Sequence, residues 1–185
     1  MSKQRPAVAV LVGSLRKGSF NKQLALALEK VAGDRAEFRH IRIDDLPLYN
    51  QDFDGDYPAV CKRLKDEIKA CDAVLFVTPE YNRSIPGVLK NAIDIASRPY
   101  GHSAFAGKPG AVIGTSAGAM ATALAQQHLR NICVFLDIPL LQQPEAFVRY
   151  TEGLFAGDGS VTDESVAKFL GNFIDKYLAW VSRLV

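Results

Sequence analysis

Two short runs of this chain are apolar at every position, Ala7–Val12 and Ala73–Val77. A strand that is apolar on both faces is covered on both faces, as in parallel sheets with helices packed on either side. A helical pattern follows each run, so the alternation of strand and helix predicts an α/β sheet. Ligands of such sheets bind beyond the carboxyl ends of the strands, and the loops after these two runs are therefore the first candidates for a site.

Five parallel strands are predicted, separated by helices, at residues 6–12, 36–43, 72–78, 109–115 and 136–141. The second segment mixes charged and apolar residues, which indicates an edge strand, and we expect the strand order 2-1-3-4-5. A final amphipathic helix should close over one sheet face. Its predicted apolar stripe consists of Val166, Phe169, Leu170, Phe173, Ile174, Tyr177, Leu178 and Val181.

The composition indicates one globular domain over residues 1–185. Hydrophobic residues make up 48% of the chain, and no Gly/Ser-rich or Pro-rich linker divides it. The first apolar run ends at Gly13, too early for a signal-peptide core or a membrane span, so we expect a cytoplasmic protein without a membrane partner. A net charge of +2 is too small to indicate nucleic-acid binding.

The three cysteines, Cys61, Cys71 and Cys133, form no Cys-x-x-Cys pair and have no histidine nearby at metal-ligand spacing. We therefore expect buried thiols in a reducing compartment, with neither a disulfide framework nor a metal site.

The loop after the first apolar run, Gly13–Asn21, predicts an anion site. A helix should begin near Ser19, a good N-cap residue, and its free backbone N–H groups would point into the loop. Ser14 and Ser19 add hydroxyls, Asn21 adds an amide, and Arg16 adds a guanidinium. A cluster of donors of this kind suits a phosphate.

The loop after the second run, Pro79–Gly87, holds an aromatic side chain, an amide and several backbone polar groups between two prolines. Such a set suits a flat heterocycle that needs stacking and edge hydrogen bonds, and we interpret it as a flavin site. One phosphate and one ring indicate FMN. The side chain of Glu80 should turn away, because a carboxylate beside an electron-rich reduced flavin is unfavourable, while its backbone contacts the ring.

The predicted cofactor-binding residues follow three different strands. They are Ser14, Arg16, Ser19, Phe20, Asn21, Pro79, Glu80, Tyr81, Asn82, Arg83, Ser116 and Gly118. No catalytic side chain and no metal ligand is predicted, because the flavin N5 carries the chemistry. Arg83, Arg98 and Lys108 are candidates to attract the phosphates of a nicotinamide nucleotide.

Three segments together resemble the NADPH-dependent FMN reductase family, in particular its bacterial quinone and chromate reductases. They are Gly-Ser-Leu-Arg-Lys-Gly-Ser-Phe-Asn at 13–21, Pro-Glu-Tyr-Asn at 79–82 and Ile-Pro-Gly-Val-Leu-Lys-Asn-Ala-Ile-Asp at 85–94. The resemblance, which extends to about Phe147, implies a flavodoxin-like three-layer fold, bound FMN, and NADPH or NADH as co-substrate. It implies a small oxidant as acceptor, such as a quinone, chromate, an azo dye or free flavin, and a homodimer or homotetramer. Arg83, where relatives often carry an aromatic residue, departs from the pattern, as does the glycine-poor segment 118–121.

Other functions fit less well. A response regulator needs acidic residues after the first strand, where this chain has Gly13 and Ser14, and a P-loop needs a lysine at the position of Ser19. The dinucleotide motif Gly-x-Gly-x-x-Gly is missing. A flavodoxin-type electron carrier, which binds FMN without turning over a small substrate, is the alternative, although the slightly basic chain and Arg16 favour the enzyme.

Gly114–Gly118 is a complete Gly-x-Ser-x-Gly pattern at a predicted turn from strand to helix, the context of a serine-hydrolase nucleophile. Hydrolases of that fold order their triad as Ser, then an acid, then His. The only histidine after Ser116 is His128, with no acid between them. We therefore interpret the segment as a turn whose backbone approaches a flat ligand.

Overall fold

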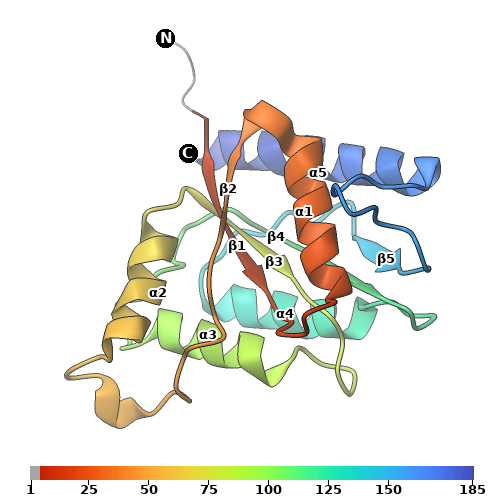
Figure 1. Cartoon of the computed structure of the whole chain (residues 1–185). Coiled ribbons are helices and arrows are strands. Elements are labelled where there is room, and N and C mark those ends of the chain that lie inside the picture. The colour runs from red at the N-terminus through yellow and green to blue at the C-terminus, as the bar shows by residue number, and fades with distance from the viewer. Residues whose placement is uncertain (1–4) are drawn as a thin grey trace.

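The computed structural model describes residues 5–185 and shows a parallel five-stranded sheet between two layers of helices (Figure 1). The strands are β1 (Ala7–Val12), β2 (Glu37–His40), β3 (Ala73–Val77), β4 (Gly110–Ser116) and β5 (Phe147–Arg149). Their order is β2-β1-β3-β4-β5, which confirms the predicted flavodoxin-like arrangement.

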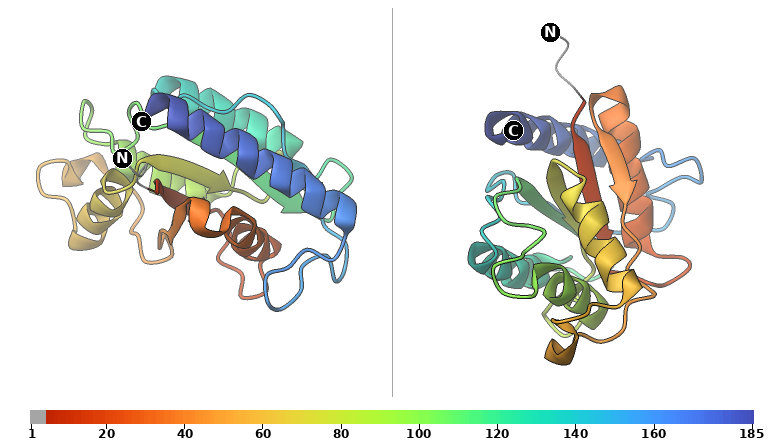
Figure 2. Two further views of the ribbon diagram at one scale, coloured as in Figure 1. Left: turned by 90° about the horizontal axis from the view of Figure 1, so that it is seen from above. Right: turned by 90° about the vertical axis from the view of Figure 1, so that its left-hand side faces the viewer.

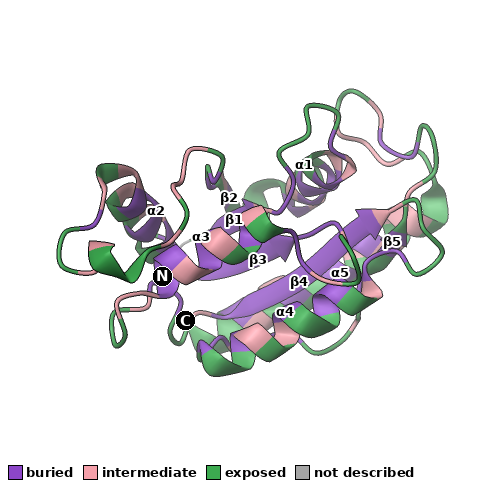
Figure 3. Cartoon of the chain, turned by 90° about the horizontal axis from the view of Figure 1, so that it is seen from below, coloured by how far each residue is buried: buried purple, intermediate pink, exposed green. Residues whose placement is uncertain are grey.

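Helices α2 (Ala59–Lys69), α3 (Gly87–Ser97) and α4 (Ala123–Phe135) cover one face of the sheet, and α1 (Phe20–Ala32) and α5 (Glu164–Leu184) cover the other (Figure 2). Two 3-10 turns, η1 (Gly33–Arg35) and η2 (Gln51–Phe53), complete the elements. Successive strand residues point to opposite faces, so β1 and β3 contribute side chains to both cores; β3 is buried throughout, and β1 is buried up to Leu11 (Figure 3).

Both predicted helix features are present. Ser19 is the N-cap of α1, and its hydroxyl accepts a hydrogen bond from the backbone N–H of Lys22 at 3.2 Å. The predicted stripe of α5 packs on the sheet, with Leu170, Phe173, Ile174, Tyr177 and Val181 buried. Among residues 5–185, no helix combines the length and the apolar character needed to cross a membrane.

The fifth strand lies later in the chain than predicted, so the prediction of a strand at 136–141 was wrong. Asp137 has a φ of 54°, a left-handed conformation that ends α4 and that no strand residue adopts. Pro139 has no N–H group to donate to a sheet. Only Leu140 forms a bridge, to Gly110, after which the chain leaves the sheet and returns as β5 beside the last residues of β4.

The edge strand β2 is shorter than the predicted segment 36–43. Its regular pairing with β1 ends at His40, although the N–H of Ile41 still donates to the carbonyl of Val10 at 3.0 Å. Beyond Ile41 the chain diverges from β1.

Candidate functional site

The loop between β1 and α1 presents a row of backbone donors that other residues do not use. Within residues 5–185, the N–H groups of 14–18, Phe20 and Asn21 have no acceptor. Ser14 is buried, and its hydroxyl forms no hydrogen bond to another described residue. A loop of this kind at a helix N-terminus binds anions, because unpaired N–H groups and the helix dipole both favour negative charge. The geometry therefore fits the phosphate of FMN.

Arg16 lies against the ring of Phe20 at this loop. Its guanidinium lies 4.4 Å from the ring centroid of Phe20, and its Nη2 donates to the carbonyl of Gly18 at 2.6 Å. The ring of Phe20 stacks in turn on Tyr150, with 3.5 Å between centroids and 12° between planes. Tyr150 follows β5, and the sequence analysis did not predict its contact with Phe20. A single aromatic residue gives no sign in the sequence that it will stack on a ring in a distant part of the chain.

Asn21 uses its side chain to join two elements. Its Nδ2 donates to the carbonyl of Thr115 at 2.9 Å, and its Oδ1 accepts from the N–H of Thr115 at 3.0 Å. The amide is buried and bonded to Thr115 through both its nitrogen and its oxygen, and the backbone N–H of Asn21 is a further donor that has no acceptor among the described residues. The hydroxyl of Ser19 caps α1 as an acceptor and keeps its proton for a ligand.

The loop after β3 forms a tight hairpin. Tyr81 and Ser84 each donate a backbone N–H to the other's carbonyl at 3.0 Å. Asn82 and Arg83 at the tip have φ values of 52° and 62°, the left-handed conformation typical of such two-residue turns. Tyr81, Asn82 and Arg83 are exposed. The hairpin therefore has a defined backbone and presents its aromatic and amide groups outward, and neither Tyr81 nor Asn82 caps α3, whose N-cap is Pro86.

The side chain of Glu80 points toward the beginning of α4. Its Oε2 accepts hydrogen bonds from the backbone N–H groups of Leu124 and Ala125 at 3.0 Å each, at the beginning of α4. The carboxylate is thus occupied by a helix N-terminus.

The segment after β4 is a second tight turn. Gly118 donates its N–H to the hydroxyl of Ser116 at 3.2 Å. A Cβ at Gly114 would overlap the carbonyl oxygen of Thr78, so this glycine allows the ends of β3 and β4 to approach. His128 contacts Ser84 through Nδ1 at 3.0 Å, and no described residue joins it to Ser116. The Gly-x-Ser-x-Gly segment 114–118 therefore forms the turn at the end of β4, and Ser116 is not paired with His128.

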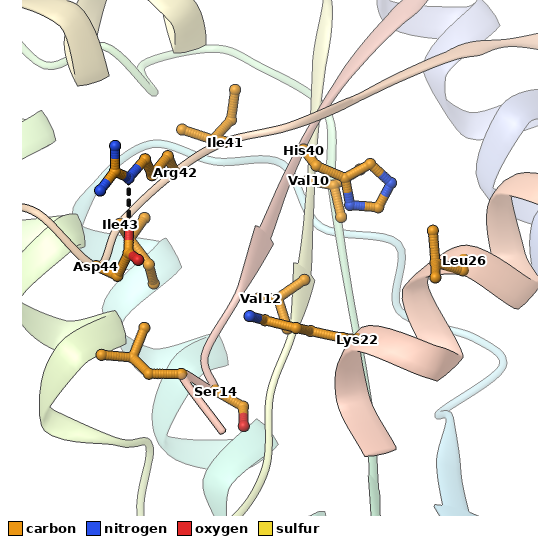
Figure 4. Close-up of a pocket in the computed structure, with 11 residues that line it drawn as sticks. Val10, Val12, Ser14, Lys22, Leu26, His40, Ile41, Arg42, Ile43 and Asp44 are labelled. Atoms are coloured by element: carbon orange, nitrogen blue, oxygen red, sulfur yellow. Dashed lines mark hydrogen bonds and ion pairs between the residues drawn. The ribbon is translucent and has the colours of Figure 1, made fainter. Parts of the chain in front are cut away.

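A cavity of about 340 Å³ lies on the β2 side of β1, between α1 and the chain that follows β2 (Figure 4). Val10 and Val12 of β1 lie opposite Lys22 of α1, and Ser14 of the first loop lines one end. Arg42 at its rim is paired with Asp44, at 2.6 Å between Nε and Oδ1. The hairpin after β3 lies on the other side of β1, so this cavity is separate from the predicted ring position.

The positions of Arg98 and Lys108 do not fit the prediction that they attract the phosphates of a nicotinamide nucleotide at the flavin site. Arg98 follows α3 and Lys108 precedes β4, so both lie at the opposite end of the sheet from the loop after β1. The Nζ of Lys108 donates to the carbonyl of Cys71, and the carbonyl of Arg98 accepts from Nζ of Lys65.

All three cysteines are buried, as predicted, and burial raises the pKa of the Cys133 thiol to about 12.

A family model described as NADPH-dependent FMN reductase matches residues 6–152. The chain belongs to this family. It is 53% identical over 174 residues to a 2-hydroxy-1,4-benzoquinone reductase of Burkholderia sp., covering 94% of this chain and 95% of the relative. A quinone reductase of Pseudomonas putida is 49% identical over 176 residues, covering 95% and 94%.

Among solved structures, the flavoenzyme FerB of Paracoccus denitrificans, an NAD(P)H:(acceptor) oxidoreductase, superposes with a TM-score of 0.93 at 50% identity, covering 97% of this chain and 98% of FerB. This reductase is thus an NAD(P)H-dependent flavin oxidoreductase with FMN as its cofactor, and the unpaired donors after β1 are the feature of its own structure that fits FMN.

Proposed function

We propose that this reductase carries electrons from NAD(P)H to a quinone, with the nucleotide and the quinone occupying the same face of the flavin in turn. The overall reaction takes a hydride from NAD(P)H and a proton from solvent and converts the quinone to a hydroquinone. Bound FMN supplies an N5 position that accepts a hydride and passes it on. The observation that carries the proposal is the pairing of an anion-binding loop after β1 with a rigid hairpin after β3 at the same edge of the sheet.

The loop after β1 would hold the FMN phosphate. The N–H groups of 14–18 and of the first turn of α1 surround this position, and Arg16 adds a cation held over Phe20. Binding there would anchor the phosphate of FMN, and these groups would take no part in hydride transfer.

The two turns after β3 and β4 would hold the ring. Backbone N–H groups of Glu80 and Asn82 have no acceptor in the described part of the chain, so they are available to the ring edge, and Tyr81 offers an aromatic face. Pro79, Arg83, Ser116 and Gly118 complete the proposed set. The only carboxylate of the hairpin, that of Glu80, is bound to α4, so the hairpin offers no free acid, and the proton of the overall reaction would come from solvent.

The acceptor class is a quinone. The relatives with 53% and 49% identity are named for reducing a hydroxybenzoquinone and a quinone, respectively. Chromate, azo dyes and free flavin are further small oxidants that an open ring face would reduce, and the measured ranking of kcat/KM across such a panel would identify the preferred class.

A steady-state experiment tests the function. With FMN-loaded protein, NADPH or NADH, and a benzoquinone, we expect turnover without any added reductase, and parallel lines in double-reciprocal plots at several quinone concentrations. Turnover that begins only when a separate reductase is supplied would identify an electron carrier of the flavodoxin type instead.

We further propose that the single domain 1–185 works in the cytoplasm as a homodimer or homotetramer. The support is a set of exposed apolar residues in and before α4, namely Met120 at 62%, Val134 at 80% and Phe135 at 70% exposure. Light scattering coupled to size exclusion would give the mass, and a monomer at micromolar concentration would refute this part.

A further inference from the structure

Helix α4 begins without a cap of its own. The residue before it, Thr122, makes no side-chain bond to the free N–H groups of the first turn, and its Oγ1 accepts instead from Nε2 of Gln126 at 2.9 Å. The N–H groups of Leu124 and Ala125 are satisfied by the carboxylate of Glu80, which lies 44 and 45 positions earlier in the chain. The capping group of α4 therefore comes from the hairpin after β3.

A second contact joins the same hairpin to the same helix. Oγ of Ser84, at the other end of the hairpin, lies 3.0 Å from Nδ1 of His128, one turn further along α4. The two strands of the hairpin are held together by the paired backbone bonds of Tyr81 and Ser84. Helix α4 thus holds the hairpin at both ends and leaves its tip exposed.

The beginning of α4 also fixes the turn after β4. The N–H of Ala121 donates to the carbonyl of Gly118 at 3.0 Å, and the N–H of Ala123 donates to the carbonyl of Met120 at 3.1 Å. Ala121 has a φ of 48°, a left-handed conformation, and the chain therefore passes from this turn into α4 through a sharp bend. The Glu80 carboxylate, which binds the first turn of α4, is therefore connected through that helix to the turn that contains Gly118.

We propose that Glu80 is a positioning residue, whose carboxylate sets the distance between the hairpin 80–84 and the turn 117–122 and thereby shapes the place of the flavin ring. This inference rests on the proposed function, in which these two turns hold the ring. A carboxylate that accepts two backbone N–H groups at a helix N-terminus makes charge-assisted bonds, and the helix dipole adds to them. The same contact keeps a negative charge away from a ring that becomes electron-rich on reduction.

The proposal predicts that changing Glu80 lowers the affinity for the flavin ring and leaves the contribution of the phosphate to binding unchanged. Glu80→Ala should weaken the binding of riboflavin and of FMN by the same factor, about tenfold, since the two charge-assisted hydrogen bonds that join the hairpin to α4 are removed and the ring-binding turns are no longer held together. Glu80→Gln, which keeps one acceptor without the charge, should lie between the wild type and Glu80→Ala. In contrast, Arg16→Ala should weaken FMN alone.

Asp163→Ala is the matched control. Asp163 is also a carboxylate cap, accepting from the N–H of Val166 at 3.0 Å, but it caps α5 and touches neither turn. Both alanine variants should lower the melting temperature, and only Glu80→Ala should change the flavin Kd measured by fluorescence quenching.

The inference is overturned if Glu80→Ala, folded by circular dichroism, binds riboflavin and FMN as the wild type does while losing thermal stability as Asp163→Ala does. If Glu80→Ala does not fold, the same comparison is made with Glu80→Gln, and an unchanged flavin Kd in that variant refutes the proposal. A wild type that binds no flavin would instead refute the proposed function, so the two failures are distinguishable.

Discussion

The side-chain amide of Asn21 occupies a place in the sheet that no strand residue fills. At the end of β3, the N–H of Thr78 donates to the carbonyl of Ile113, and the next position on that edge of β4 belongs to Thr115. There Asn21 accepts from the N–H of Thr115 and donates to its carbonyl, at 3.0 and 2.9 Å. The amide thus mimics a peptide group and ties the first turn of α1 to β4.

Replacing Asn21 with alanine should therefore destabilise the whole fold. Both backbone groups of Thr115 would lose their partner in a buried setting, at a cost of about 2 to 4 kcal/mol in the free energy of unfolding. Urea denaturation measures this loss. Asn131→Ala, at an exposed position of α4, is the control and should change the free energy by less than about 0.5 kcal/mol. An Asn21→Ala variant as stable as this control would contradict the role assigned to the amide.

Replacing Arg16 with alanine should weaken FMN binding without slowing the chemistry. One charge-assisted hydrogen bond, worth about 1.5 to 3 kcal/mol, corresponds to roughly a tenfold to hundredfold increase in Kd. Riboflavin has no phosphate and should bind the wild type and the variant equally. At saturating FMN the variant should recover a kcat near that of the wild type. Lys17→Ala, which removes the neighbouring exposed cation, should raise the Kd less. Equal FMN affinity in Arg16→Ala and the wild type would remove Arg16 from the phosphate site.

Replacing Ser116 with alanine should leave most of the NAD(P)H-dependent reductase activity. The hydroxyl of Ser116 accepts from the N–H of Gly118, and the nearest candidate base in the chain order, His128, is bound to Ser84. We therefore expect no hydrolysis of p-nitrophenyl esters by the wild type. Ester hydrolysis that is present in the wild type and lost in Ser116→Ala would show a nucleophilic serine.

Cys133 should make the fold less stable in alkaline solution. Burial raises the pKa of its thiol to about 12, whereas the pKa of a thiol in the unfolded chain is about 8.5. Between these values the unfolded state releases a proton that the folded state keeps, so the free energy of unfolding falls as the pH rises through this window. The slope contributed by one such group approaches about 1.4 kcal/mol per pH unit.

Denaturation of the wild type and of Cys133→Ala at pH 7.5 and pH 10.5 would measure this contribution, because the other titrating groups cancel in the difference. We expect the variant to lose less stability between the two pH values. An identical loss in both proteins would mean that the thiol does not govern this part of the pH dependence.

The sequence by itself determined the local features. Fully apolar runs predicted the buried strands β1 and β3, the mixture of charged and apolar residues in 36–43 predicted an edge strand, and Ser19 predicted the beginning of α1. These features depend on residues close together in the chain, so their spacing carries the information.

The remaining features depend on residues far apart in the chain, and the tertiary structure decided them. The fifth strand was predicted too early, because a short apolar segment such as 136–141 looks the same whether it pairs along its length or at one bridge. Glu80 reaches α4, Asn21 reaches Thr115, and Tyr150 reaches Phe20 only after the sheet brings their elements to one edge. A hydrogen bond or a stacked ring between distant elements leaves no periodic trace in the sequence, since each partner is a single residue whose neighbours serve other contacts.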